Sequence, residues 1–315
     1  MKKKIILDCD PGMDDSMAIV MAAKSDVLSL LAVTTLNGNY PADVTAKNAL
    51  KVVEMLGIDI PVAKGMSEPM VRSSPQDPFT HGSDGQADIN LPEPERRLSP
   101  LHAVDLIIRL VRENPGEVSL VCTAPLSNVA MAMKLAPDIK PLIKEIIAIS
   151  GSFGLNQAAF LNATGDTPQS EWNVYVDPEA AKIVYESGVP FKAIGLDVAT
   201  FFSVDFSDDD ISRLRESDRR EAKFLSNAID FVRGRGYKAY CTCIDCMAVA
   251  YAIDNSLIRF EKCRVGIETK DGLTLGMTVR DGRHHHVWQD LEEIEVAVDA
   301  DYRRFLDMLV SLSIE

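Results

Sequence analysis

Short apolar runs alternate with amphipathic segments along the first part of the chain. Runs of strand length stand at 4–9, 28–35, 118–123, 145–150 and 191–196. Segments with apolar residues at three- and four-residue spacing predict helices at 15–24, 42–56, 101–113 and 126–135. This alternation predicts an α/β fold with an open, mostly parallel sheet that is flanked by helices.

Prolines support the predicted helix starts. Pro41, Pro100 and Pro125 stand where a first helical turn tolerates proline, because its missing N–H would have no partner there. In an open parallel sheet the ligand site lies beyond the carboxyl ends of the strands. We therefore expect the functional residues on the segments that follow the apolar runs.

Two segments, 64–99 and 151–173, interrupt the alternation and are too long for simple connectors. We expect both to form walls of the site. Beyond residue 196 the pattern predicts mainly helix to 254, then short strands at 263–269, 273–279 and 294–298 and a closing helix at 302–312. No stretch has the composition of a linker, so a single domain over 1–315 is expected.

Composition and charge exclude several classes of protein. The formal net charge is −14 and the basic residues are scattered, which argues against nucleic acid as a partner. No apolar run approaches the ~18 residues of a membrane span. Residues 1–10 run directly into a strand pattern without the apolar region of a secretory signal, so a cytoplasmic location is expected.

Cysteines and histidines form two conspicuous groups. Cys241, Cys243 and Cys246 could suggest zinc, but no matching second pair follows and the segment is apolar, so buried free thiols are expected. The run His284 to His286 is expected in a solvated surface loop, because consecutive histidines do not easily face one ion.

The strongest chemical signal is the segment 8–15, DCDPGMDD, which follows the first strand and opens the first helix. Its crowded carboxylates repel one another and raise each other's pKa unless a hard cation neutralises them. An EF-hand loop is excluded, because Gly12 stands at its fifth position and Ile19 at its twelfth. Opposition to the helix dipole would explain only Asp14 and Asp15.

The pattern Asp-x-Asp-Pro-Gly-x-Asp-Asp resembles the signature of the inosine-uridine-type nucleoside hydrolase family. Further segments are similar to family blocks in the same order: 33–39, 122–128, Glu171 to Asn173, 177–181, 244–251 and 276–279. The resemblance therefore covers nearly the whole chain. It implies hydrolysis of the N-glycosidic bond of ribonucleosides to ribose and free nucleobase, in nucleoside catabolism and nucleotide salvage.

The resemblance also implies a metal site. Ca²⁺ would be held by Asp10, Asp15, Asp245 and the backbone carbonyl of Thr123, with ribose hydroxyls and a water completing its shell. This all-oxygen set suits Ca²⁺. Asp10 would act as general base toward the metal-bound water.

The substrate contacts implied by the resemblance involve the ribose hydroxyls. Asp14 and Asn173 would hold the 2′-hydroxyl, Asp245 the 3′-hydroxyl, and Glu171 and Asn162 the 5′-hydroxyl, with Asn39 supporting the acidic cluster.

The roles of His81 and Trp172 each have two alternatives. His81 matches a family loop histidine that contacts substrate, and a solvent-facing loop histidine is the alternative. Trp172 could stack on a base or belong to the core.

The chain departs from the family at Ile244, where many members carry a histidine credited with protonating the departing base. Tyr237, Lys238, Tyr240 and His81 are other candidates for that acid. Two alternative functions follow: a non-catalytic nucleoside- or calcium-binding protein, and a haloacid dehalogenase-type phosphatase with Asp-x-Asp after the first strand. The sequence does not predict base preference; a homo-oligomer, dimer or tetramer, is expected.

Overall fold

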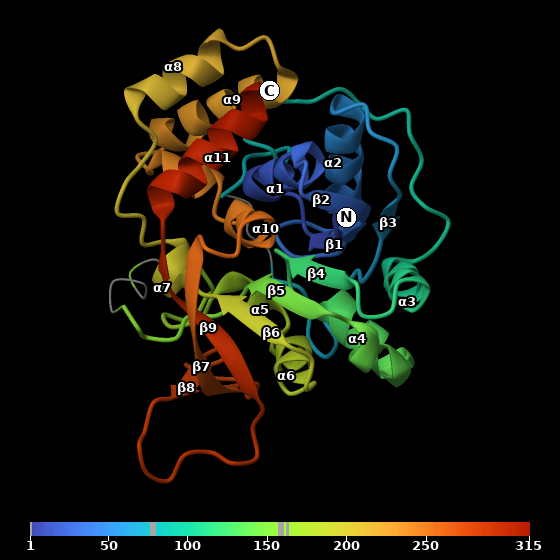
Figure 1. The fold of residues 1–315 in the computed structure, drawn as a ribbon, viewed down its shortest axis with the longest axis vertical. Coiled ribbons are helices and arrows are strands. Elements are labelled where there is room, and N and C mark those ends of the chain that lie inside the picture. The colour runs from blue at the N-terminus through green and yellow to red at the C-terminus, as the bar shows by residue number, and fades with distance from the viewer. Residues whose placement is uncertain (1, 76–79, 157–160, 162–163) are drawn as a thin grey trace.

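A single sheet runs through the protein. The structure is a computed structural model that describes residues 2–75, 80–156, 161 and 164–315. Within these residues the strand order is β3-β2-β1-β4-β5-β6-β9-β7-β8 (Figure 1). The strands are β1 Lys3–Cys9, β2 Leu28–Thr35, β3 Val62–Lys64, β4 Val118–Cys122, β5 Glu145–Ile149, β6 Phe191–Ile194, β7 Ile258–Ile267, β8 Thr278–Asp281 and β9 Glu293–Ala300.

The pairing confirms the predicted fold class. Every pair from β3 to β9 in this order is parallel, whereas β9 with β7 and β7 with β8 are antiparallel. The antiparallel strands extend as an arm from the body, with the 282–292 loop at its tip (Figure 1).

Helices cover both faces of the sheet (Figure 1). On one face lie α1 Met13–Lys24, α2 Ala42–Met55, α8 Asp208–Glu216, α9 Arg220–Gly234, α10 Cys246–Ile253 and α11 Tyr302–Ile314. On the other lie α3 Ala103–Glu113, α4 Ser127–Leu135 and α6 Pro178–Tyr185. Shorter pieces are η1 Pro137–Leu142, α5 Trp172–Val176, α7 Leu196–Ala199 and η3 Ala239–Thr242.

Strand β1 shows why its sequence is a continuous apolar run. Ile5 and Leu7 belong to one hydrophobic cluster and Ile6 to the other, and none of the three is exposed. Successive side chains point to opposite faces, so a strand covered on both sides needs apolar residues throughout. Burying each such side chain contributes about 1.5–3 kcal/mol.

Several boundaries differ from the sequence prediction. Strand β3 was not predicted, because its three residues are too few to give a pattern. Helix α3 begins at Ala103 rather than 101, since the His102 ring accepts a hydrogen bond from the Val104 N–H at 3.3 Å and caps the helix. Strand β7 begins at Ile258, earlier than predicted, because its first residues pair with β9.

The strand predicted at 273–279 is wrong over most of its length. The chain turns there, with φ of +145° at Gly272 and +76° at Gly276, and β8 starts only at Thr278. A positive φ of this kind is adopted readily by glycine and breaks the extended pattern.

The cysteine and histidine predictions are mostly confirmed. All six cysteines are free, Cys243 and Cys246 are buried and Cys241 is partly buried. No group of cysteines converges on a potential metal position among the described residues. His284 to His286 are exposed. In the part of the chain that is described, no helix is long and apolar enough to cross a membrane.

Candidate active site

A cavity of about 640 Å³ lies where the parallel strands end. The segments that follow β1, β2 and β4 reach it, as do the starts of α1, α5 and α10 and the end of α9. Its walls include Asp14, Asn39, Thr123, Glu171 and Asp245. The predicted position at the carboxyl edge of the sheet is thus where the cavity is found.

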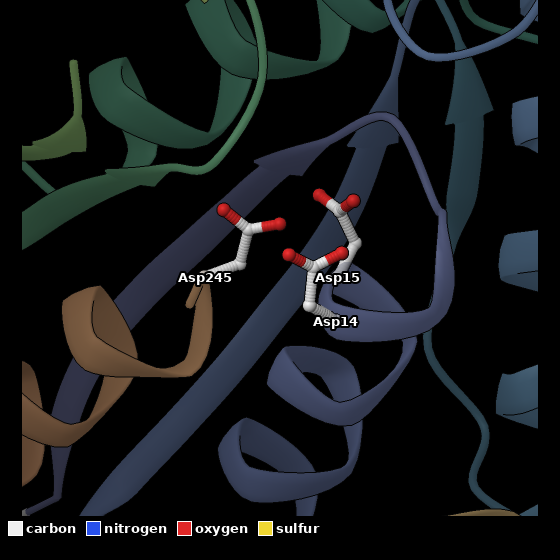
Figure 2. A group of neighbouring side chains, drawn as sticks. All are labelled: Asp14, Asp15 and Asp245. Atoms are coloured by element: carbon white, nitrogen blue, oxygen red, sulfur yellow. The ribbon is translucent and has the colours of Figure 1, made fainter. Parts of the chain in front are cut away.

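Three buried carboxylates face one another (Figure 2), and two of them, Asp14 and Asp245, line the cavity. Asp14 and Asp15 stand in the first turn of α1, and Asp245 stands just before α10. Each offers one oxygen, and these oxygens lie within 4.8 Å of one another. Packing of α1 against α10 therefore completes a carboxylate group whose members are far apart in sequence.

Asp10 lies next to this group. Its Oδ2 accepts a hydrogen bond from the Asn39 N–H at 2.6 Å, and its own N–H donates to Asp15 Oδ1 at 3.3 Å. Its Oδ1 is buried and has no hydrogen-bond partner among the described residues. Gly38 permits this approach, because a Cβ there would lie 2.0 Å from Asp10 Oδ2.

Thr123 and Asn173 join the ends of β4 and β5 to the acidic group. The Thr123 hydroxyl donates to Asp15 Oδ1 at 2.7 Å. The Asn173 side-chain amide donates to the carbonyls of Thr123 at 3.0 Å and Ile149 at 3.1 Å. These bonds fix Asp15 and orient the Thr123 carbonyl.

Burial without a compensating charge raises the pKa values of these acids. Desolvation raises the pKa of Asp14 and of Asp15 to about 6. Burial, and then repulsion by Asp15, raises the pKa of Asp10 well above its usual range, and burial followed by repulsion from Asp14 does the same for Asp245. A cation among these oxygens would offset both the desolvation of the carboxylates and their mutual repulsion.

Asp8 differs from its neighbours in the motif. Its Oδ1 accepts hydrogen bonds from the Thr34 hydroxyl at 2.6 Å and the Asn128 amide at 2.8 Å. It does not line the cavity. Burial raises its pKa to about 7. Asp8 therefore has a structural role, because its hydrogen bonds connect the end of β1 to β2 and α4.

Glu171 lines the cavity and also caps α5. Its carboxylate accepts from the backbone N–H groups of Asn173 at 2.7 Å, Gly151 at 3.0 Å and Val174 at 3.1 Å. Burial raises its pKa to about 7. The side chain is thus held rigidly with its oxygens already engaged by the backbone.

His81 is buried, so the alternative of a solvent-facing loop histidine is wrong. The side chain lies against the start of α1, where its Nδ1 accepts from the Met13 N–H at 3.3 Å and lies 3.7 Å from Asp14 Oδ1. It lines the cavity.

Trp172 is buried and also lines the cavity, so stacking on a base stays a prediction. It is 8% exposed, packs against the Tyr175 ring with centroids 6.2 Å apart, and also lines the cavity. Its indole N–H is buried with no acceptor among the described residues. Asn162 lies outside the described residues.

The wall beside Asp245 is formed by Ile244, Tyr237, Tyr240, Cys241 and Arg235. Lys238 is not on this wall. Arg235 and Thr200 were not predicted, and no local signal distinguishes them. They reach the cavity only because the end of α9 and the segment after α7 pack around it.

The chain is similar to a known protein family over nearly its whole length. The family described as inosine-uridine preferring nucleoside hydrolase matches residues 5–307. The chain belongs to this family. Its members are ribonucleoside hydrolases, enzymes that cleave the N-glycosidic bond, so the predicted class of enzyme is confirmed.

The sequences of individual relatives match this chain over almost their full length. The pyrimidine-specific ribonucleoside hydrolase RihA of Shewanella sp. (strain MR-7) is 35% identical, over 98% of this chain and 96% of its own. The inosine-uridine preferring nucleoside hydrolase of Crithidia fasciculata is also 35% identical, over 98% and 97%.

Solved structures of such enzymes share the fold. A plant nucleoside hydrolase, PpNRh1, superposes with a TM-score of 0.86 at 29% identity, covering 100% of this chain and 99% of its own. A purine-preferring ribonucleoside hydrolase from Gardnerella vaginalis gives 0.84 at 29% identity, covering 99% and 98%. The phosphatase and non-catalytic alternatives gain no support from these matches.

Proposed function

We propose that this nucleoside hydrolase family member cleaves ribonucleosides to ribose and free nucleobase in a calcium-dependent reaction. The observation that carries the proposal is the buried group of Asp14, Asp15 and Asp245, which has Asp10 beside it and reaches the wall of the cavity through Asp14 and Asp245. Such a concentration of buried carboxylates is costly unless a cation and a polar ligand occupy the site.

The donor atoms fit a hard cation. Oδ1 of Asp10 and Oδ1 of Asp14 are buried without hydrogen-bond partners among the described residues. We infer that Asp10, Asp15, Asp245 and the Thr123 carbonyl would hold Ca²⁺, because a carbonyl oxygen bonded to Asn173 still has a second lone pair. When bound, the ion neutralises the carboxylates and lowers the pKa of a coordinated water.

Asp10 is the proposed general base. Its Oδ2 is fixed by the Asn39 N–H, which leaves Oδ1 to accept a proton from the water that attacks the anomeric carbon. This role requires the ionised carboxylate, and therefore compensation of the neighbouring charge of Asp15.

The other acids bind the sugar and stabilise its developing positive charge. We propose that Asp14 and Asn173 hold the 2′-hydroxyl, Asp245 the 3′-hydroxyl, and Glu171 with Asn162 the 5′-hydroxyl. Glu171 has both oxygens engaged by backbone N–H groups, but a carboxylate has further lone pairs to accept from a hydroxyl.

Departure of the base needs a proton that Ile244 cannot supply. The titratable groups on the cavity wall that could donate it are His81, Tyr237, Tyr240 and Cys241. At neutral pH the Tyr240 and Cys241 side chains are protonated, because burial raises their pKa values further above neutrality.

Assay of free ribose with a panel of ribonucleosides tests the proposal. After treatment with a chelator, we expect no release; addition of Ca²⁺ should restore it, and Zn²⁺ should not. No ribose from uridine, cytidine, inosine, adenosine or guanosine in the presence of Ca²⁺ would overturn the proposal. The same panel identifies the preferred base, on which the names of the relatives differ.

A further inference from the structure

A second cavity of about 340 Å³ lies between α2, α9 and the segment 89–92. It shares no lining residue with the active-site cavity. Its lining consists of Lys51, Glu54, Met55, Ile89, Leu91, Pro92, Arg220, Lys223, Phe224 and Asn227.

The lining has an apolar part that suits the hydrocarbon body of a small ligand. Phe224 is buried, and Met55, Ile89 and Leu91 are partly buried hydrophobic residues packed against the main core. Side chains of this kind bind the body of a small ligand, while a few polar groups fix its orientation.

Two cations in the lining lack a close partner. Lys51 is 8% exposed, yet its ammonium donates no hydrogen bond within the described residues, and the nearest carboxylate recorded for it, Glu93, lies 4.0 Å away. Glu93 pairs more closely with Lys47, at 2.6 Å. Arg220, also on the lining, has neither an ion pair nor a hydrogen bond in the described part of the chain.

The remaining charges leave the cavity positive. Glu54, the acid of the lining, is engaged by the backbone N–H groups of Glu95 at 2.9 Å and Arg96 at 3.1 Å. Lys223 lies 3.5 Å from the exposed carboxylate of Asp218. The chain has a net charge of −14, but this cavity is lined by three cations and one acid, so its lining carries a net positive charge. An anion that enters the cavity would meet charge-assisted hydrogen-bond donors there.

We propose that this cavity binds an aromatic carboxylate, whose ring lies on Met55, Ile89, Leu91 and Phe224 and whose carboxylate is bound by Lys51 and Arg220. The volume is near the lower end of the range for small-molecule sites, which suits one or two fused rings. Arginine and lysine bind carboxylates through charge-assisted hydrogen bonds. The site is independent of the proposed hydrolase reaction.

The test compares 2-naphthoate with its neutral analogue 2-naphthamide by isothermal titration calorimetry on the full-length protein. We expect 2-naphthoate to bind at least ~10-fold more tightly, because hydrogen bonds to a charged carboxylate are stronger than those to a neutral amide. Lys51→Met and Arg220→Met should each weaken 2-naphthoate binding by a similar factor and leave 2-naphthamide binding unchanged.

Lys134→Met is the control, because Lys134 is an exposed lysine on α4, on the opposite face of the sheet. It should bind 2-naphthoate as the parent does. Absence of binding to the parent, equal affinity for the two naphthalenes, or unchanged binding in Arg220→Met would each overturn the proposal. Arg220 is exposed, so its replacement tests the site even if Lys51→Met fails to fold.

Discussion

At the scale of single residues, the two carboxylate oxygens of Asp10 have unequal surroundings. Oδ2 is fixed by Asn39, and Oδ1 has no partner among the described residues. We predict that Asp10→Asn lowers kcat by ~10²–10⁴-fold, the usual contribution of a general base, without lowering the thermal midpoint. Ribose release and calorimetry would measure both.

Asp8→Asn is the matched control for this prediction. Asp8 is an equally buried aspartate of the same segment, but its carboxylate accepts hydrogen bonds from Thr34 and Asn128, whereas Asp10 accepts one from Asn39, a residue of the cavity wall. Its replacement should affect stability more than turnover. If Asp10→Asn turned over substrate as fast as the parent, Asp10 would not be the base.

Trp172 gives a prediction about stability. Its buried indole N–H has no acceptor among the described residues, which costs about 1–3 kcal/mol and offsets part of what the ring gains by packing. We therefore predict that Trp172→Phe changes the free energy of unfolding by less than about 1.5 kcal/mol, and that Trp172→Ala lowers it by about 3–5 kcal/mol. Urea denaturation of both variants checks this. A loss well above about 1.5 kcal/mol in Trp172→Phe would mean that the indole N–H is satisfied in solution.

Ile244 gives a prediction about the leaving group. Since isoleucine cannot protonate a departing base, a riboside of nitrophenolate, which leaves without a proton, should be cleaved ~10²–10⁴-fold faster than inosine. Steady-state kinetics on the two substrates measure the ratio. Equal rates would show that another wall residue is the acid. Variants of His81, Tyr237, Tyr240 and Cys241 would then identify it by selective loss of inosine cleavage.

At the scale of elements, α5 couples the active-site cavity to the sheet. Glu171 caps its first turn, and Asn173 ties it to the ends of β4 and β5. We predict that Glu171→Ala lowers the free energy of unfolding by about 1–2 kcal/mol through loss of the cap. Glu171→Gln keeps one acceptor oxygen and should lose less. Chemical denaturation measures both, and an unchanged stability in Glu171→Ala would mean that the cap contributes nothing.

At the scale of the whole molecule, the buried acids make stability depend on pH. Burial raises the pKa of Asp8 and Glu171 to about 7 and of Asp14 and Asp15 to about 6, whereas the unfolded chain titrates near 4. The neutral acids are therefore favoured in the folded state. Their contribution to stability is fully present below about pH 4 and is lost as the pH rises through 6 and 7.

We predict that the chelated protein has a higher thermal midpoint at pH 5.5 than at pH 8, and that added Ca²⁺ raises the midpoint more at pH 8. Calorimetry at both values, with chelator and with Ca²⁺, tests this. A metal-free midpoint that rose from pH 5.5 to pH 8 would contradict it. Mg²⁺ at the same concentration is the control for ionic strength.

The sequence by itself determined the features that are local along the chain. Strands such as β1 and helices such as α2 follow from the spacing of apolar residues, because burial on two faces or one stripe dictates that spacing. The segment 8–15 is contiguous and follows a predicted strand, so its carboxylates lie near one strand end. Family resemblance then indicated Asp245, which no local pattern would select.

Tertiary structure alone decided what depends on contacts between distant segments. Packing of α10 against α1 brings Asp245 to Asp14, and the turn of the long loop buries His81 on α1. Strand β3 exists only because β2 offers it an edge. The raised pKa values and the position of Arg235 likewise arise from burial in the assembled fold, since desolvation and neighbouring charges depend on which segments pack together rather than on their order in the chain.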